Sequence, residues 1–258
     1  MKTITRKKEA IYSGNLLLVN QNHPLRNRPE YNLVPAMPGF PAVLLNRDAA
    51  NILQMILGRI AAGGSIIPVS GYRSEQEQAA IYAASLADNG EKFTKQFVAL
   101  PNCSEHQTGL AIDLGINQDE IDFICPDFPY EGICQSFRKE APNYGFIERY
   151  AKEKEAITGI SHEPWHFRYV GFPHSKIIWE RKLALEEYIE FIKAYHGSNR
   201  LVYQQGDQTE MEIYYIPADD GNTCIPLPEN SVYQISGNNT DGFIVTIYDI
   251  FMRRKNNE

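Results

Sequence analysis

The stretch SEHQTGLAID at residues 104–113 decides the fold of this chain, together with the stretch EPWH at residues 163–166. They contain two imidazoles and three carboxylates. Catalytic zinc needs three protein ligands that leave a fourth position open, and an unliganded base that takes a proton from water. The composition of the two stretches predicts one zinc ion per chain, with these ligands: His106, Asp113 and His166. Glu163 is then the predicted general base.

The local sequence explains how these side chains can converge. Thr108-Gly109 is a turn-like pair, and the apolar run at residues 110–112 indicates the start of a buried strand. A turn followed by a strand can direct two side chains to one point. Pro164 argues against a helix, so we expect Glu163 and His166 to converge from a loop that enters a strand at residues 166–170.

A third block lies upstream, SGYRS at residues 70–74 with Gln78. The pattern SGYRSxxxQ, then SxHxxGxAxD, then ExPWH resembles the zinc D,D-peptidases of the VanY type, and most of all the VanXY branch of that family. The resemblance covers roughly residues 40 to 195. It implies an α+β fold of the Hedgehog and D,D-peptidase type, with an antiparallel sheet and flanking helices.

The resemblance also implies an activity and roles for further residues. The expected reaction is zinc-dependent removal of the C-terminal D-Ala from D-Ala-D-Ala, from D-Ala-terminated muramyl pentapeptides, or from both, in cell-wall metabolism and vancomycin resistance. Arg73 corresponds to the arginine that binds the scissile carbonyl and its oxyanion. Gln78 and Ser104 correspond to positions that hold the terminal D-Ala. Arg73 could instead be an ordinary turn residue, and Gln78 and Ser104 could be merely structural.

Two alternative functions remain open at this point. The family contains peptidases that cut other wall bonds, and the related Hedgehog signalling domain keeps a similar fold without established peptidase activity. A non-catalytic zinc module would need neither Glu163 nor Arg73 to hold its metal. The presence of both residues therefore favours an enzyme.

Composition sets broad limits on partners. The chain has 258 residues, 43% of them hydrophobic and 22% charged, with a net charge of −7. This composition is typical of an ordinary globular protein and argues against a nucleic-acid partner. The four cysteines form no CxxC pair and fit free thiols in a reducing compartment. A homodimer is left open.

The sequence also bears on location. No stretch approaches the roughly twenty apolar residues that a membrane span requires. The apolar run at residues 16–19 is too short for the core of a signal peptide. We therefore expect a cytoplasmic enzyme, or an exported one if an anchor has been trimmed from the chain.

Patterning predicts the remaining elements. Asn46 or Asp48 can cap a helix that runs to about residue 61, and Ser74 with Glu77 forms a capping box for a helix that Gly90 ends. We further expect a strand at 65–70, one long helix at 175–195, turns at 220–221 and 236–237, and an insertion at 119–135 that is either a lid or a surface loop. Four strands are predicted near the C-terminus: 201–203, 212–216, 231–235 and 243–248. We expect a catalytic domain at 1–198 and a small β-rich domain at 199–258.

Overall fold

The computed structural model describes residues 1–26, 32–206 and 209–248. The chain forms two compact units. One contains the described residues between 19 and 185, and the other joins residues 1–18 to the described residues between 186 and 248. The predicted boundary after residue 198 therefore differs from the observed division. The cause is a strand at the N-terminus that pairs with a strand near the C-terminus, a contact that sequence patterning does not reveal.

The unit at residues 19–185 is built on a four-stranded antiparallel sheet with the order β4-β5-β7-β6. The bounds of these strands are β4 Ile66–Ser70, β5 Ala111–Ile116, β6 Phe146–Tyr150 and β7 Glu163–Tyr169. A smaller hairpin pairs β2 (Leu33–Pro35) with β3 (Leu44–Asn46). The helices are α1 Arg47–Arg59, α2 Glu75–Phe97, α3 Gly132–Tyr144, α4 Glu155–Thr158 and α5 His174–Arg181, with 3₁₀ turns η2 at Glu105–Thr108 and η3 at Lys152–Lys154.

The structure confirms the predicted caps at the start of the first two helices. The side chain of Asn46 accepts from the backbone N–H groups of Asp48 and Ala49 at the start of α1. Ser74 and Glu77 form the expected capping box of α2. Gly90 breaks the helical backbone with φ of 80°, but the chain resumes as helix and continues to Phe97. The prediction that Gly90 ends a helix is therefore confirmed: α2 consists of two helices that meet at a kink at Gly90, and the second of them, which runs to Phe97, was not predicted.

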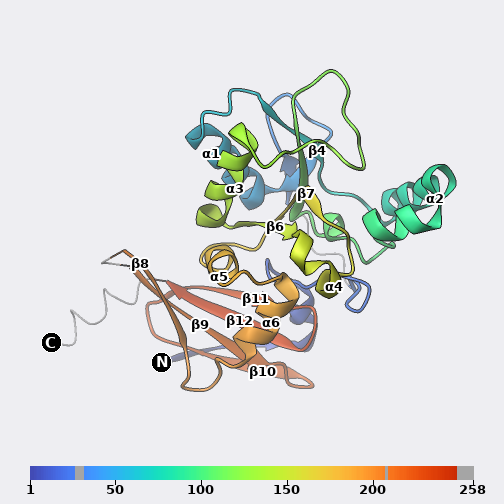
Figure 1. Cartoon of the computed structure of the whole chain (residues 1–258). Coiled ribbons are helices and arrows are strands. Elements are labelled where there is room, and N and C mark those ends of the chain that lie inside the picture. Colours follow the sequence, from blue (N-terminus) through green and yellow to red (C-terminus); the bar gives the residue numbers. More distant parts are fainter. Residues whose placement is uncertain (27–31, 207–208, 249–258) are drawn as a thin grey trace. The chain divides into compact units, whose positions relative to one another are not determined.

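The core of this unit lies between the sheet and the helices α1 and α3, which pack against each other (Figure 1). Its buried residues come from both helices and from the inner faces of the strands, and include Leu53, Phe137, Ile112 and Phe167. Figure 1 shows α2 on the other side of the strands from α1 and α3. The rigid sheet thus carries the segments that contain the three sequence blocks.

Gly71 lies where the backbone after β4 passes close to β3. A Cβ atom at this position would lie 2.1 Å from the carbonyl oxygen of Leu44, so only glycine fits. The N–H of Tyr72 donates to the same carbonyl at 2.6 Å. This close approach fixes the path of the chain immediately before Arg73.

The second unit contains two antiparallel sheets. One has the order β11-β12-β9-β8, and the other pairs β1 with β10. Their bounds are β1 Lys2–Lys7, β8 Leu201–Gln205, β9 Thr209–Pro217, β10 Asn222–Leu227, β11 Val232–Gly237 and β12 Gly242–Tyr248. The unit also includes the 3₁₀ turn η1 (Lys8–Tyr12) and helix α6 (Leu185–Lys193). Its core includes Ile11, Tyr214, Ile225, Phe243 and Val245. The four predicted C-terminal strands are confirmed; β1 and β10 were not predicted.

Two other local expectations are wrong. The single helix predicted at 175–195 is two helices, because Lys182 takes a left-handed conformation with φ of 54° and ends α5. The turn predicted at 236–237 lies later, because Ser236 and Gly237 still pair with β12 and Asn238 instead accepts from the N–H groups of residues 240–242. Within the described ranges, no helix combines the length and the apolar character needed to cross a lipid bilayer.

Candidate metal centre and cleft

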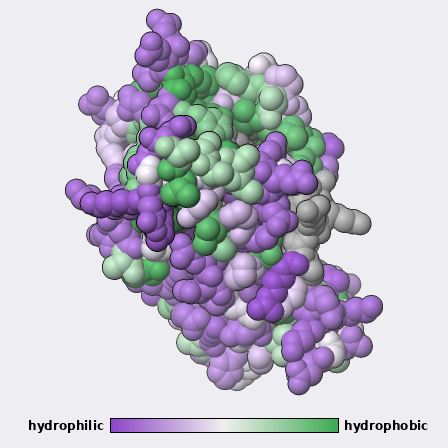
Figure 2. All heavy atoms as spheres, turned by 90° about the vertical axis from the view of Figure 1, so that its right-hand side faces the viewer, coloured by the Kyte–Doolittle hydropathy of each residue, from purple (hydrophilic) through white to green (hydrophobic). Residues whose placement is uncertain are grey.

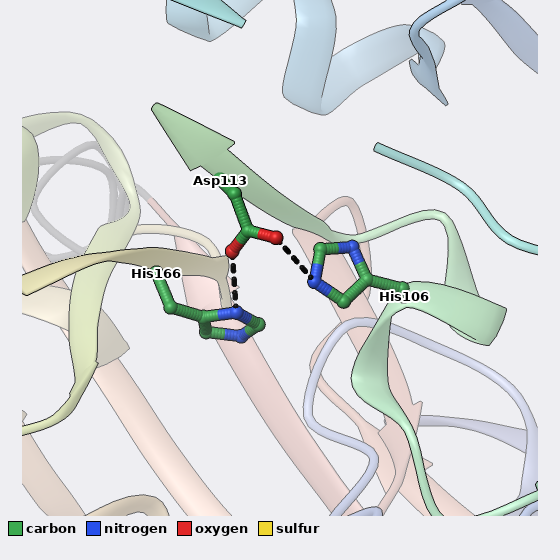
Figure 3. A group of neighbouring side chains, drawn as sticks. All are labelled: His106, Asp113 and His166. Atoms are coloured by element: carbon green, nitrogen blue, oxygen red, sulfur yellow. Dashed lines mark hydrogen bonds and ion pairs between the residues drawn. The ribbon is translucent and has the colours of Figure 1, made fainter. Parts of the chain in front are cut away.

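Three predicted ligands converge at the centre of the sheet. His106 lies in η2, Asp113 in β5 and His166 in β7, and all three side chains are buried. One potential ligand atom from each lies within 4.8 Å of the others. Figure 3 shows the Asp113 carboxylate between the two imidazoles.

The sheet register explains the meeting of Asp113 and His166. The two residues face each other directly in the antiparallel ladder between β5 and β7. Directly opposed residues have Cβ atoms about 4.5–5.5 Å apart on one face of a sheet. His106 reaches the same point because η2 ends at Gly109, whose left-handed φ of 70° turns the chain into β5. The predicted arrangement of a turn followed by a strand is therefore observed.

Hydrogen bonds orient the ring of His106. Its Nδ1 lies 2.7 Å from the carbonyl oxygen of Gly71, and its Nε2 lies 3.1 Å from Oδ2 of Asp113. A carbonyl can only accept, so Nδ1 carries the proton and Nε2 is left unprotonated in the neutral ring. Burial, followed by the nearby charge of Arg73, lowers the pKa of His106 to about 4. A neutral His106 directs the lone pair of its Nε2 toward the carboxylate of Asp113. Both atoms are hydrogen-bond acceptors, so their contact is favourable only when a cation lies between them.

His166 has a different protonation balance. Its Nδ1 lies 2.9 Å from Oδ1 of Asp113, and its Nε2 lies 3.5 Å from Oε2 of Glu105. Burial alone would lower the pKa of His166, but the carboxylates of Asp113 and Glu105 outweigh it and raise that pKa to about 9. The pKa of Asp113 falls below its usual range, because the two histidines outweigh the opposing effect of burial. A metal ion would take the place of the proton that His166 shares with Asp113.

The donor set fits zinc. Two imidazole nitrogens and one carboxylate oxygen form a three-ligand site of the catalytic kind, which leaves one position open. Cys103 is not among the residues that line the cleft, so the described structure offers no thiolate as a fourth ligand.

Glu163 is the spare carboxylate of the cleft. It is buried, lines the cleft, and has Oε2 3.8 Å from Nδ1 of His166. Burial is the main cause that raises its pKa to about 8. A buried acid with a pKa near the working pH is suited to accept and return a proton.

Glu163 lies within β7 rather than in a loop before it, which corrects that expectation. Residues three apart on a regular strand point to opposite faces. Here the pairing of β7 with β6 shifts register between Glu148 and Tyr150, and such an irregularity can redirect a side chain. Pro164 is tolerated because β5 pairs with β7 only from His166 onward.

Arg73 also enters the cleft. Its Nη2 lies 2.9 Å from Oδ2 of Asp113, and its Nε donates to Oγ of Ser70 at 2.8 Å. The guanidinium therefore stands beside the candidate metal position, held by the last residue of β4. Its pKa is lowered by burial, although Asp113 and Glu163 favour the charged form.

The two residues expected to hold the terminal D-Ala are placed differently. Ser104 is buried and lines the cleft. Gln78 is fully buried and does not line it: its Nε2 donates to the carbonyl of Ala99 at 2.8 Å, and its Oε1 accepts from Arg73 at 3.4 Å. Substrate binding by either residue stays a prediction.

Apolar residues form the rest of the cleft. The apolar and aromatic residues that line it are Ile81, Phe97, Val98, Ala99, Ile124, Tyr150, Ile160 and Trp165. Ile124 comes from the predicted insertion, and the ring of Phe123 lies 5.5 Å from the guanidinium carbon of Arg73, so this segment borders the site. Figure 2 shows green apolar groups among purple polar ones on the face that includes α2.

Sequence reasoning missed three buried charged residues: Glu105, Arg149 and Arg168. Oε1 of Glu105 lies 2.9 Å from Nε of Arg149 and 2.8 Å from Nη1 of Arg168. The two arginines hold the pKa of Glu105 well below its usual range despite its burial. A signal was present for Arg168, which stands between Phe167 and Tyr169 in a strand, because a buried charge requires a partner.

Comparisons with known proteins agree with this geometry. A family model described as VanY, D-alanyl-D-alanine carboxypeptidase, matches residues 42–172. The bifunctional D-Ala-D-Ala dipeptidase and carboxypeptidase VanXYC of Enterococcus gallinarum is 46% identical over 181 residues, which are 69% of this chain and 95% of that protein.

Two solved structures are also similar. The D,D-dipeptidase VanXYg, in complex with a D-Ala-D-Ala phosphinate analog, has a TM-score of 0.95 and 64% identity, covering 96% of this chain and 98% of that one. A mutant of the D,D-pentapeptidase VanY from a VanB-type resistance cassette, in complex with Zn(II), has a TM-score of 0.56 and 28% identity, covering 68% and 98%. The predicted fold class is confirmed.

Proposed function

Because the chain belongs to the VanY family of D-alanyl-D-alanine carboxypeptidases, we propose that it is a zinc-dependent D,D-peptidase that removes the C-terminal D-Ala from D-Ala-D-Ala and from muramyl pentapeptides. One observation carries the proposal. The candidate ligands converge beside a spare carboxylate and a guanidinium that a purely structural metal site would not need. The similarity to VanXYC and VanXYg favours activity on the free dipeptide as well.

The proposed roles follow from the positions of the groups. A zinc ion held by His106, Asp113 and His166 would supply Lewis acidity to the scissile carbonyl and to water. Glu163 accepts a proton from the attacking water and returns it to the leaving amine of D-Ala. Arg73 donates hydrogen bonds to the oxyanion that develops on the carbonyl oxygen. The buried cleft strengthens each of these electrostatic interactions.

The test is release of D-Ala by the zinc-loaded protein from two substrates side by side, D-Ala-D-Ala and the UDP-linked muramyl pentapeptide, with a chelated control. We expect release from both and none after chelation. Release from the pentapeptide alone would restrict the enzyme to carboxypeptidase activity. Release of D-Ala from a third substrate, the muramyl tetrapeptide, would identify a peptidase that cuts another wall bond. If the protein binds zinc but releases D-Ala from none of these substrates, it is a non-catalytic zinc module.

Arg73 offers a sharper test of the chemistry. Arg73→Lys keeps a positive charge but loses the planar fork of donors. We expect kcat on D-Ala-D-Ala to fall about 100- to 1000-fold, because one donor to the oxyanion is lost. The matched control is Arg59→Lys, which alters an exposed arginine paired with Glu140 at 3.7 Å. Unchanged kcat for Arg73→Lys would remove Arg73 from the mechanism.

The location of the reaction is a separate prediction. A cytoplasmic enzyme would meet free D-Ala-D-Ala and UDP-linked precursors before they are exported. Fractionation of cells that express the natural chain, followed by immunodetection, tests this expectation.

A further inference from the structure

The clearest feature that the proposed mechanism does not use is the buried group formed by Glu105, Arg149 and Arg168. Glu105 precedes a candidate ligand in η2, Arg149 lies in β6 and Arg168 in β7. All three are at most 2% exposed. Two arginines share Oε1 of Glu105, at 2.9 Å and 2.8 Å. The carboxylate is thereby fixed from two strands, and its other oxygen remains available.

That other oxygen is directed at a candidate metal ligand. Oε2 of Glu105 and Nε2 of His166 are both fully buried and have no other hydrogen-bond partner in the part of the chain that the structure describes. The two atoms lie 3.5 Å from each other. Two buried polar atoms without other partners are costly unless they satisfy each other, so a small movement that closes this distance is favourable.

The two histidines then form a symmetric arrangement. His106 presents Nε2 to Asp113 while its Nδ1 is held by the carbonyl of Gly71. His166 presents Nδ1 to Asp113 while its Nε2 faces Glu105. In each ring the nitrogen away from Asp113 meets an oxygen that accepts, which leaves the inner nitrogen free to bind a metal.

We propose that Glu105, fixed by Arg149 and Arg168, is a positioning residue that accepts a hydrogen bond from Nε2–H of His166 and so directs the Nδ1 lone pair into the metal site. The inference rests on the proposed zinc site. A carboxylate behind a histidine ligand fixes its tautomer and raises its basicity, and loss of such a partner typically costs 10- to 100-fold in metal affinity.

The first test is Glu105→Gln, with zinc affinity measured by competition with a chromophoric chelator. We expect the zinc Kd to rise about 10- to 100-fold, and the visible spectrum of the Co²⁺-loaded protein to change. Glu148→Gln is the matched control, because it removes a carboxylate from another arginine pair of the same sheet, with Arg138 at 2.8 Å. We expect its zinc affinity and Co²⁺ spectrum to match those of the unmodified protein. An unchanged Kd and spectrum in Glu105→Gln would reduce Glu105 to a structural role and overturn the proposal.

The second test avoids any folding defect of the variant, because it uses the unmodified protein. Long-range ¹H–¹⁵N NMR of the zinc-loaded protein distinguishes the two tautomers of each ring. We expect a slowly exchanging Nε2–H for His166 and an Nδ1–H for His106. An Nδ1–H tautomer of His166 would refute the role of Glu105. Failure of the unmodified protein to bind zinc would instead overturn the proposed function.

Discussion

Glu163→Ala is expected to abolish measurable D-Ala release while the protein still binds one zinc ion. Positioned proton transfer contributes on the order of 100- to 10,000-fold to a rate, and Glu163 is assigned both the uptake and the return of the proton. Its carboxylate lies 3.8 Å from His166 and is not needed to complete the ligand set. Loss of activity with retained metal is therefore the expected combination.

The experiment measures kcat on D-Ala-D-Ala and zinc content by mass spectrometry in the same preparation. Glu163→Gln is the companion variant, because it keeps the size of the buried side chain and removes only the ionisable group. We expect both variants to be inactive. Residual activity near that of the unmodified protein in Glu163→Gln would show that another group moves the proton. Loss of zinc in both variants would instead identify Glu163 as a ligand.

Asp113→Asn is expected to remove zinc binding at micromolar metal and, with it, all activity. Asp113 is the one anionic member of the candidate ligand set and contacts three groups: His106, His166 and Arg73. An amide of the same shape would leave the positive charge of Arg73 beside the metal without its neutralising partner. We expect the zinc Kd to rise by at least about 100-fold. Loss of a ligand should weaken zinc binding more than loss of a residue that is hydrogen-bonded to a ligand, which typically costs about 10- to 100-fold.

Asp127→Asn is the matched control, because the side chain of Asp127 is exposed and is not among the groups that line the cleft. Its zinc content and activity should equal those of the unmodified protein. Circular dichroism of both variants checks that the fold persists. One equivalent of zinc at unchanged affinity in Asp113→Asn would exclude Asp113 from the ligand set.

The sequence predicted the parts of this molecule that depend on local chemistry. Asn46 and the Ser74–Glu77 pair begin helices, and Gly109 turns the chain before β5. The block containing His106 and Asp113 and the block containing His166 could be placed together because zinc restricts the types and number of its ligands. These features depend on neighbours in sequence or on the shared metal, so the strand pairing that joins the two blocks did not have to be foreseen.

The parts that could not be predicted depend on distant partners. Strand β1 is mostly exposed and highly charged, and its pairing with β10 spans nearly the whole sequence. Lys182 ends α5 in a left-handed conformation without the glycine or asparagine that usually marks such an ending. Glu105 resembles a surface residue until Arg149 and Arg168 are brought to it from two strands.

The direct pairing of Asp113 with His166 has an evolutionary consequence. The register of β5 and β7 cannot change without loss of the candidate metal site. A deletion of one residue within either strand would turn Asp113 or His166 to the opposite face of the sheet. The loops that connect β5 to β7, outside β6 and the helices between them, are not held to a fixed length in this way. Descendants of this fold can therefore change their loops, and with them the substrates they admit, while the two strands keep their lengths.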